Sequence, residues 1–482
     1  MSDEQQQGRR ADRAGATAPG RRGLASSRKV DVLVVLGMVL PTVVVLAVAL
    51  IRGDDTEPYP DAPPSAARLT DASVVCAAAS SSTAGDVVVS RLPRMSGGEV
   101  AVHAAADDAA TLRELSPVDV ESGRLTTVAT DGDVLVTGTD AAAPGLVAGR
   151  TGEARAAAEC RGPSYDEWYV GLGAAAKNAS SIELVNPDTG PAVVEIALYG
   201  RRGLLVEAEE LHGIRVPGQQ VMRLDLSDLV PRRGTLAAHL TVVRGRVVPT
   251  VRHTYDPLGR GTPRIDFLPA QAEPATENLL LGVPPDSSGE VHLFNPGADE
   301  ARATVRVVSD SAVFTPAGLD DVVVPAGTVR QVPLSNVLTE EAAQGALGLQ
   351  VVSEQPLVAS VRLLDDDLGL VAPVTAVEQN QLTTAVVPAG PKLLALAGAE
   401  RTGTVRVTAT DARGEVLLDE KVVEVDADRG YSLELPDDAV LVTIDPRNTS
   451  IAGTVVLTGD RIGVLRMRAA AVDAEIPVVR PE

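Results

Sequence analysis

Residues 182–200 read IELVNPDTGPAVVEIALYG, and residues 291–309 read VHLFNPGADEARATVRVVS. Each stretch carries an aliphatic run, then an Asn-Pro pair, then residues that alternate between apolar and polar. Asn186 and Asn295 are 109 positions apart. Self-similarity at a fixed spacing is typical of repeated structural units, so this pair of stretches predicts a repeat of roughly 100 residues.

Two further matches follow in the same order. IRVPGQQ matches VVVPAGT with an offset of 108 between Val216 and Val324. VRHTYDPLG matches VRLLDDDLG with an offset of 110 between Val251 and Val361. A weaker third copy contains TVRV at 404–407 but lacks the Asn-Pro pair. The near-constant offset predicts two repeats and indicates a third.

Inside the repeats, short runs rich in Val and Thr are separated by turn-forming residues, as in AVVEIALYG at 192–200 and TVRVVSDSAVF at 304–314. A period near two with β-branched residues favours strands. Pro and Gly recur every ~8–12 residues, which is the spacing of a β-sandwich. We therefore predict an all-β protein made of tandem immunoglobulin-like β-sandwich modules after one N-terminal transmembrane helix.

The segment 71–160 has β-type runs (86–90, 99–105 and 133–138) but no repeat signature, so we interpret it as a divergent first module. The predicted organisation comprises a disordered basic cytoplasmic tail (1–31), a transmembrane helix (32–51), a linker (52–70), a disulfide-closed β module (71–163) and three β-sandwich repeats (164–262, 275–372 and 382–476).

The chain is strongly acidic. It has 43 Lys and Arg against 65 Asp and Glu, a net charge of −22. Nucleic acid is therefore not an expected partner, because phosphates require a basic surface. Aromatic residues are rare, at 2% of the 482 residues, so aliphatic side chains must fill the cores. Small modules suit such cores better than one broad pocket.

Residues 32–51 read VLVVLGMVLPTVVVLAVALI and carry no charge. At ~1.5 Å per residue, this helix crosses the ~30 Å hydrocarbon layer. Basic residues precede it, so we expect a single-pass cell-membrane protein with a cytoplasmic N-terminus and an extracytoplasmic bulk. The alternative is a cleaved signal peptide, since Ala47-Val48-Ala49 has the small-x-small form, although secretory apolar regions are usually shorter.

Cys76 and Cys160 are the two cysteines of the chain, and both follow the apolar segment. An even pair in an oxidising compartment predicts a disulfide. This bond would close the first module and stabilise it by ~4 kcal/mol in the entropic description. The alternative, metal or redox chemistry, has little support because no CxxC motif is present.

Tyr165, Trp168 and Tyr169 lie within five positions. Flat rings with polar tips stack on sugars, so one hypothesis is a glycan-stacking site. The alternative is a core anchor, with Trp168 packed near Cys160 at the junction of the first two modules, because a buried Trp often packs near a disulfide in such sandwiches.

No catalytic motif is evident: HExxH and GxSxG are absent, and the histidines lack ligand spacing. We therefore expect no enzymatic activity, no catalytic residue, no metal and no cofactor. An enzymatic alternative would rest on acids at a module junction, with Asp256 and the run 365–367 as candidates.

Several features together resemble a family. A basic tail, one apolar span, an early cysteine, the segment CRGPSYDEWYVG (160–171) and LVNP are similar to an actinobacterial family of uncharacterised, membrane-anchored, extracytoplasmic β-rich proteins. The resemblance covers nearly the whole chain, although Arg161 stands where we would expect proline. Members are often encoded beside a membrane glycosyltransferase, so the resemblance implies a role in envelope polysaccharide assembly.

We therefore expect a non-enzymatic, membrane-tethered cell-envelope protein whose β-modules act as a scaffold or interaction partner. We describe these modules as a rod, although the sequence leaves a compact cluster as the alternative arrangement. A membrane glycosyltransferase or a cell-wall polysaccharide is the expected partner. The alternative function is an extracytoplasmic carbohydrate-binding protein that uses the aromatic cluster.

Overall fold

The computed structural model describes residues 39–41, 43–44, 65–78, 86–92, 95, 98–105, 110–121, 124–150, 158–205, 209–334, 337–338, 343–459 and 462–476. The chain forms two units, Met1–Pro64 with Pro477–Glu482, and Ser65–Ile476. The predicted tail (1–31), most of the predicted span (32–51) and linker residues 52–64 lie outside the described residues. Within the part of the chain that is described, no helix is long and apolar enough to cross a bilayer.

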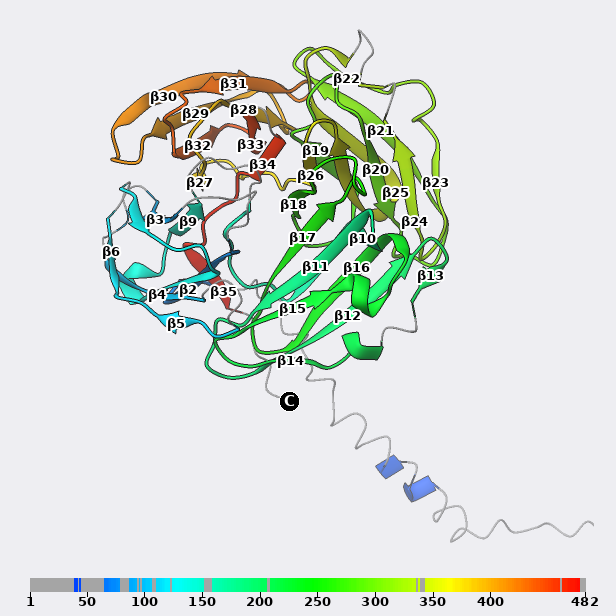
Figure 1. The fold of residues 1–482 in the computed structure, drawn as a ribbon, viewed down its shortest axis with the longest axis horizontal. Helices are drawn as coiled ribbons and strands as arrows, with labels where there is room; N and C mark the ends of the chain where they lie inside the picture. Colours follow the sequence, from blue (N-terminus) through cyan, green and yellow to red (C-terminus); the bar gives the residue numbers. More distant parts are fainter. Residues whose placement is uncertain are drawn as a thin grey trace, which may run out of the picture. The chain divides into compact units, whose positions relative to one another are not determined.

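Ser65–Ile476 is built almost entirely of antiparallel strands, which confirms the predicted all-β class (Figure 1). Four β-rich segments follow one another along the chain, and we call them the first to fourth segments. Helical structure is brief in Ser65–Ile476 and includes the α-turn α2 (Leu226–Leu229), capped by Asp225, and the 3-10 turns η1 (Asp140–Ala142) and η2 (Glu209–Leu211). Outside this unit, residues 39–41 and 43–44 are helical.

The first segment has two sheets, with strand orders β2-β8-β4-β5 and β7-β3-β9, and β6 also pairs with β4. Its strands are β2 (Asp71–Cys76), β3 (Val87–Arg91), β4 (Gly98–Ala104), β5 (Arg113–Glu114), β6 (Val118–Val120), β7 (Thr126–Val128), β8 (Val134–Thr139) and β9 (Leu146–Arg150).

The fourth segment also has two sheets, with orders β27-β32-β29-β30 and β31-β28-β33-β34. Its strands are β27 (Thr383–Val386), β28 (Lys392–Ala397), β29 (Gly403–Thr410), β30 (Val416–Val425), β31 (Tyr431–Leu435), β32 (Leu441–Arg447), β33 (Ala452–Thr458) and β34 (Ile462–Arg466). The strands β2 to β9 pair in the same order as β27 to β33, with the two short strands β5 and β6 in the place of β30. An eighth strand, β34, pairs with β33, whereas β9 pairs with β3 alone among the described residues.

The two middle segments keep the same pairing order, but their sheets are joined. In the second, β10 pairs with both β16 and β11, and in the third the single strand β25 extends through both sheets. The second-segment strands are β10 (Asp166–Ala175), β11 (Asn178–Val185), β12 (Ala192–Gly200), β13 (Gly203–Leu204), β14 (Ile214–Val216), β15 (Val221–Asp225), β16 (Arg233–Arg244), β17 (Val248–Tyr255) and β18 (Arg264–Leu268). The third-segment strands are β19 (Ala275–Leu281), β20 (Gly289–Phe294), β21 (Ala301–Ser309), β22 (Val313–Phe314), β23 (Val322–Val324), β24 (Val329–Pro333), β25 (Ala346–Leu364) and β26 (Leu368–Val371).

The Asn-Pro pairs occupy matching turns in the middle segments. The Asn186 amide donates to the carbonyls of Gly190 (2.8 Å) and Val216 (3.0 Å), and its side-chain oxygen accepts from the Asp188 N–H. Asn295 makes the same three bonds, to Asp299, Val324 and Gly297. Each side chain is buried and satisfies backbone groups that a turn leaves without a strand partner.

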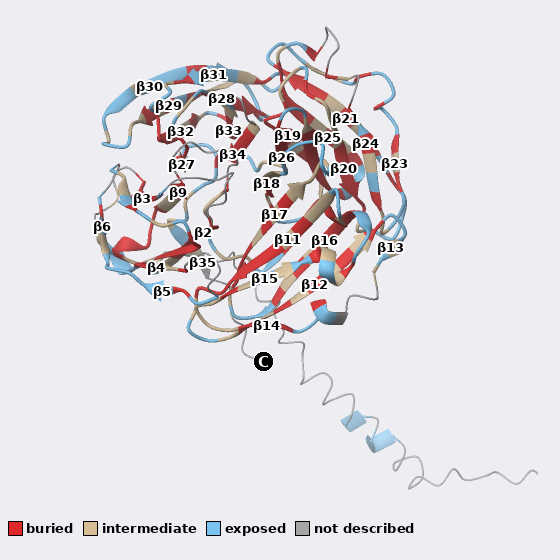
Figure 2. Ribbon diagram, viewed as in Figure 1, coloured by how far each residue is buried: buried red, intermediate tan, exposed pale blue. Residues whose placement is uncertain are grey.

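The strands alternate buried and less buried residues, as in β12, and the buried faces of each segment's strands share one aliphatic cluster (Figure 2). In the fourth segment, for example, Val405 and Ile444 of one sheet pack with Leu394 and Val455 of the other. This burial of aliphatic area is the main stabilising contribution to each segment.

Of the two arrangements that the sequence leaves open, a rod and a compact cluster, the structure has the compact cluster. Within Ser65–Ile476, the four segments stand around a circle, and each packs against the next (Figure 1). The circle is closed because β1 (Ser65–Arg68) pairs with β35 (Asp473–Ile476), and because β9 packs against β27. Modules joined in sequence form a rod only when each contacts its chain neighbours alone, and here the first also contacts the last.

Candidate functional site

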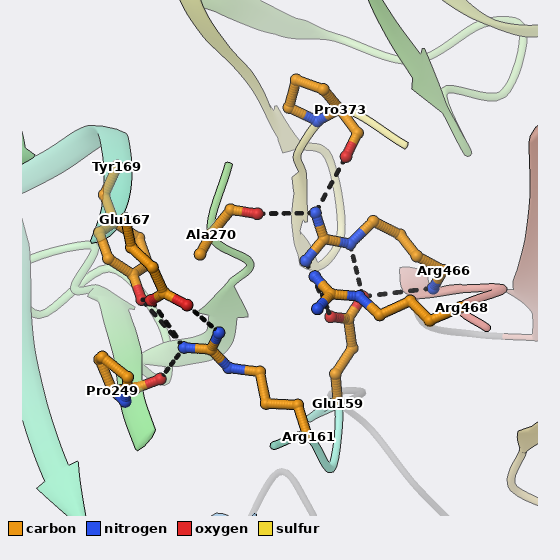
Figure 3. Close-up of polar contacts among 9 residues, drawn as sticks. All are labelled: Glu159, Arg161, Glu167, Tyr169, Pro249, Ala270, Pro373, Arg466 and Arg468. Atoms are coloured by element: carbon orange, nitrogen blue, oxygen red, sulfur yellow. Dashed lines mark hydrogen bonds and ion pairs between the residues drawn. The ribbon is translucent and has the colours of Figure 1, made fainter. Parts of the chain in front are cut away.

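The connections between segments meet at one place, which we call the linker hub. Three connectors contribute to it: residues 158–165 before β10, residues 269–274 between β18 and β19, and residues 372–382 between β26 and β27. The fourth contribution comes from the end of β34 and the residues after it. Figure 3 shows the side chains of the hub.

Arg466, the last residue of β34, contacts all three connectors. Its guanidinium donates to both carboxylate oxygens of Glu159, at 2.7 and 2.8 Å. It also donates to the Ala270 carbonyl at 2.8 Å and to the Pro373 carbonyl at 2.9 Å (Figure 3). The Arg466 side chain is only 5% exposed. One planar group with five donors thus links every inter-segment connector, which is geometry that arginine provides and lysine does not.

Arg161 forms the second centre of the hub. Its guanidinium pairs with both Glu167 oxygens, one at 2.8 Å, and donates to the Tyr169 hydroxyl at 3.2 Å and to the Pro249 carbonyl. The Tyr169 hydroxyl in turn donates to Glu167 at 2.5 Å. Glu167 and Tyr169 lie on β10, so this network fixes the first connector to the second segment.

The ionisation of the hub follows from these contacts. Burial by itself would raise the pKa of Glu159, but the Arg466 and Arg468 guanidiniums outweigh it and lower that pKa to about 2. Arg161 likewise outweighs burial and lowers the pKa of Glu167. Burial and the Glu167 charge raise the pKa of Tyr169 well above its usual value. These groups hold one ionisation state at neutral pH, so the hub is suited to fixing geometry rather than to moving protons.

The predicted disulfide is present and supports the hub. Cys76, at the end of β2, is bonded to Cys160, which lies between the two hub residues Glu159 and Arg161. Val75 and Arg161 also exchange two backbone hydrogen bonds, at 2.8 and 3.0 Å. The first connector is therefore attached to the first segment covalently and by backbone pairing.

The three predicted aromatic residues do not share a surface. Tyr165 is 60% exposed, whereas Tyr169 is 2% exposed and belongs to the second-segment core and the hub. Trp168 stacks on His239 with ring centroids 3.7 Å apart and lies 5.8 Å from the Phe294 ring. Because successive side chains of a strand point to opposite faces, Trp168 and Tyr169 diverge. The expectation that Trp168 packs near Cys160 is wrong: it packs at the junction of the second and third segments.

A serine and a histidine that the sequence did not single out are in contact. The Ser180 hydroxyl lies 2.8 Å from His253 Nδ1, and Ser180 also accepts from the Gly173 N–H. Both side chains are buried, and burial, followed by the Arg362 charge, lowers the pKa of His253 to about 3. Because both side chains are buried, a substrate does not reach the serine, and an imidazole with so low a pKa is a weak base for activating it.

The acids of the enzymatic alternative are not brought together by their contacts. Asp256 accepts from the Leu258 N–H within its own turn. Asp365 accepts from the N–H and hydroxyl of Ser288. Asp256 therefore caps its own turn, which is a common role of Asp, whereas the contact of Asp365 with Ser288 spans 77 positions.

The hub residues Glu159, Arg466 and Arg468 were missed at the sequence level. Glu159 and Arg466 are 307 positions apart, and no local pattern indicates that they meet. Arg-x-Arg at the end of a strand is more typical of a solvent-facing edge.

The fold and the hub together define a class of protein: an all-β unit of four segments whose connectors are joined by buried arginine–carboxylate pairs. The chain belongs to DUF5719, a family of unknown function, whose sequence profile matches residues 126–436. The match begins at β7 of the first segment and ends just after β31 of the fourth. No curated protein and no solved structure matches the chain.

Proposed function

We propose that this chain is a non-enzymatic cell-envelope scaffold, anchored in the membrane by residues 32–51, with a cytoplasmic N-terminus and an extracytoplasmic Ser65–Ile476 unit. In this proposal the four segments are tandem immunoglobulin-like β-sandwich modules, and the partner is a membrane glycosyltransferase of the envelope. The apolar, uncharged composition of 32–51 and the resemblance to an actinobacterial envelope family support these parts.

The observation that carries the proposal is Arg466. A guanidinium that bonds three connectors at once holds the segments in one arrangement, so that surfaces of different segments face a partner together. Pre-organised surfaces bind with a smaller entropic cost than surfaces on flexibly linked domains. A scaffold needs this property, and an isolated binding module does not.

The outer edge of the fourth segment offers one such surface. β30 is the edge strand of its sheet, and Val416 and Val422 on it are exposed. An exposed edge strand offers backbone groups to a partner strand. The charges of Asp419 and Glu420 on β30 oppose indiscriminate pairing and so favour a partner that complements them.

The test is in-membrane crosslinking followed by affinity capture of the full-length protein. We expect capture of an envelope enzyme, and weaker capture by Arg466→Lys, which retains the charge but loses the planar fork. Arg302→Lys, an exposed arginine paired with Asp321, is the matched control.

Equal capture by the wild type and by Arg466→Lys, when hydrogen exchange shows that the connectors have loosened, would contradict the scaffold role. Recovery of wall polysaccharide alone would favour the carbohydrate-binding alternative. In that case the exposed Tyr165 is the ring to substitute first.

A further inference from the structure

A pocket of about 370 Å³ lies between the first and fourth segments. Its walls are formed by β2, β9, β27, residues 158–163 and residues 465–471. Pockets that bind small molecules have volumes of roughly 300–1,000 Å³, so this one is large enough for a ligand. It lies beside β9, the strand that pairs with β3 alone among the described residues, whereas β33, the matching strand of the fourth segment, also pairs with β34.

The charge of the pocket is opposite to that of the protein. Residues 65–476 carry the whole net charge of −22, because basic and acidic residues cancel in the two terminal stretches. The pocket nevertheless presents four arginines (161, 246, 466 and 468) and two acids, Asp71 and Glu159. A cleft with an excess of basic side chains in its lining attracts anions.

Three of these arginines already have several partners. Arg161 and Arg466 are engaged in the hub, and Arg246 pairs with Asp188 and lies 3.5 Å from Asp71. Arg468 differs: among the described residues it has one ion pair, at 3.1 Å to Glu159 Oε2, an oxygen that also accepts from Arg466. Its side chain is 42% exposed, and a guanidinium has five N–H donors.

Partial burial lowers the pKa of Arg468 to about 10, and the Glu159 carboxylate opposes this more strongly than either the Arg466 or the Arg161 guanidinium adds to it. Arg468 remains a cation at neutral pH, and it has donors available for an anion beside it. Leu146, Val147, Ala385 and Val386 line the same pocket and offer apolar area to the body of a ligand.

We propose that this pocket binds an organic oxyanion, a carboxylate or a phosphate ester, whose charged group pairs with Arg468 while its body packs between β9 and β27. Arginine pairs with both groups through two parallel hydrogen bonds. This site goes beyond the scaffold role and does not depend on it, because it is tested on the purified protein without a partner.

The test is calorimetric titration of the full-length protein in detergent with glucuronate, glucose 6-phosphate and, as the neutral control, glucose. We expect one or both anions to bind and glucose not to bind. The stronger of the two anions distinguishes a carboxylate ligand from a phosphate ligand. Arg468→Gln should weaken binding by roughly 10- to 100-fold, as expected for loss of charge-assisted hydrogen bonds.

Two further variants complete the design. Arg302→Gln removes an exposed arginine outside the pocket and should bind as the wild type does. Ala470→Phe narrows the pocket without changing its charge, so it should also weaken binding. Circular dichroism checks that each variant is folded.

Three results would overturn the proposal. One is equal affinity of the wild type and Arg468→Gln. Another is equal weakening by Arg302→Gln, which would indicate general attraction to positive charge. The third is failure of both anions to bind at millimolar concentrations, where a pocket with a specific guanidinium contact should be occupied.

Discussion

Two junctions flank the second segment, and they are built from different chemistry. The junction with the first segment contains buried charges: Arg223 donates to Asp133 at 2.8 Å and to Glu183 at 3.1 Å, and the Ala78 N–H donates to Asp133 at 2.9 Å. Asp133 and Glu183 are both almost fully buried. Aliphatic side chains such as Val75 and Val248 surround them.

The junction with the third segment contains rings and neutral imidazoles. It also contains the buried Arg362, which donates to Asn178, and the buried Asp266, whose side chain accepts from the Leu370 N–H. Trp168, Phe294 and Tyr199 pack together, with 4.7 Å between the Tyr199 and Phe294 centroids. His292 is buried at this junction, close to Gly171 of β10. Burial, followed by the charge of Arg362, lowers its pKa well below the usual value, as it does for His253.

Asp133 at the first of these junctions and the two histidines at the second give opposite responses to pH. Burial and the Glu183 charge raise the pKa of Asp133 to about 7 in the folded protein. The contribution of Asp133 to the free energy of unfolding is therefore complete at low pH and is lost as the pH rises from about 4 to 7. The histidines remain neutral when folded but take up a proton near pH 6.5 when unfolded. Their contribution is therefore present above that pH and is lost as the pH falls. Between about pH 4 and 6.5 the two effects oppose one another.

The largest effect on the free energy of unfolding is expected where the buried carboxylate of Glu159 loses Arg466. Arg466→Ala leaves Glu159 buried without its bidentate donor and leaves two connector carbonyls without theirs. We expect a loss of about 3–5 kcal/mol in the free energy of unfolding, measured with urea. Arg302→Ala, which breaks an exposed pair, should change it by less than about 1 kcal/mol. Similar losses in the two variants would show that the hub does not hold the segments.

The next largest effect on stability concerns the disulfide near the junction between the first and second segments. Replacing both Cys76 and Cys160 by serine should reduce the free energy of unfolding by about 2–4 kcal/mol, because the unfolded chain regains the freedom of a long loop. Reduction of the wild type should produce the same loss. Equal stability of oxidised and reduced protein would argue that Arg161 and its neighbours alone fix this connector.

A smaller effect on stability is expected at the aromatic cluster between the second and third segments. Phe294→Leu removes the ring contacts with Trp168 and Tyr199 while keeping the site apolar. We expect a loss of roughly 1–2 kcal/mol, from one aromatic cluster and a small change in volume. Tryptophan fluorescence should shift as well, because Trp168 is the single tryptophan of the chain. An unchanged spectrum would mean that Phe294 does not define the surroundings of Trp168.

The smallest expected effect is a change in the pH dependence of stability, and it separates Asp133 from the buried histidines. Asp133→Asn removes the carboxyl group whose contribution increases on acidification, so the opposing effect of the histidines should become visible. Between about pH 6.5 and 4, stability of the variant should fall more steeply than that of the wild type, by at most ~1.4 kcal/mol per pH unit. Parallel pH profiles would show that Asp133 is already ionised in the folded protein.

The strands were predictable because their signals are local. The runs at 86–90, 99–105 and 133–138 correspond to β3, β4 and β8 within one residue at each end, and 192–200 corresponds to β12. Period-two alternation arises from the pleat of a single strand, so it needs no knowledge of the partner. The disulfide was likewise predictable, because two cysteines leave one pairing.

The closure and the hub were not predictable for the same reason. The sequence of β1, SAAR, has no strand signal of its own and becomes a strand through its pairing with β35. Arg466 contacts Glu159 across 307 positions, and whether an arginine faces water or a buried carboxylate depends on which segments meet. Tyr169 shows the same limit: the sequence leaves a sugar-stacking ring and a core anchor as alternatives for this cluster, and the Tyr169 hydroxyl is bonded to the buried Glu167.

The pairing of Ser65 with Ile476 places the two ends of the compact unit side by side. A short peptide joining them would bridge only about the 5 Å that separates paired residues. New ends opened in the exposed turn at 257–262 would then leave all four segments and the hub intact. We therefore expect a circular permutant to fold, because the contacts between segments do not depend on which segment comes first in the chain.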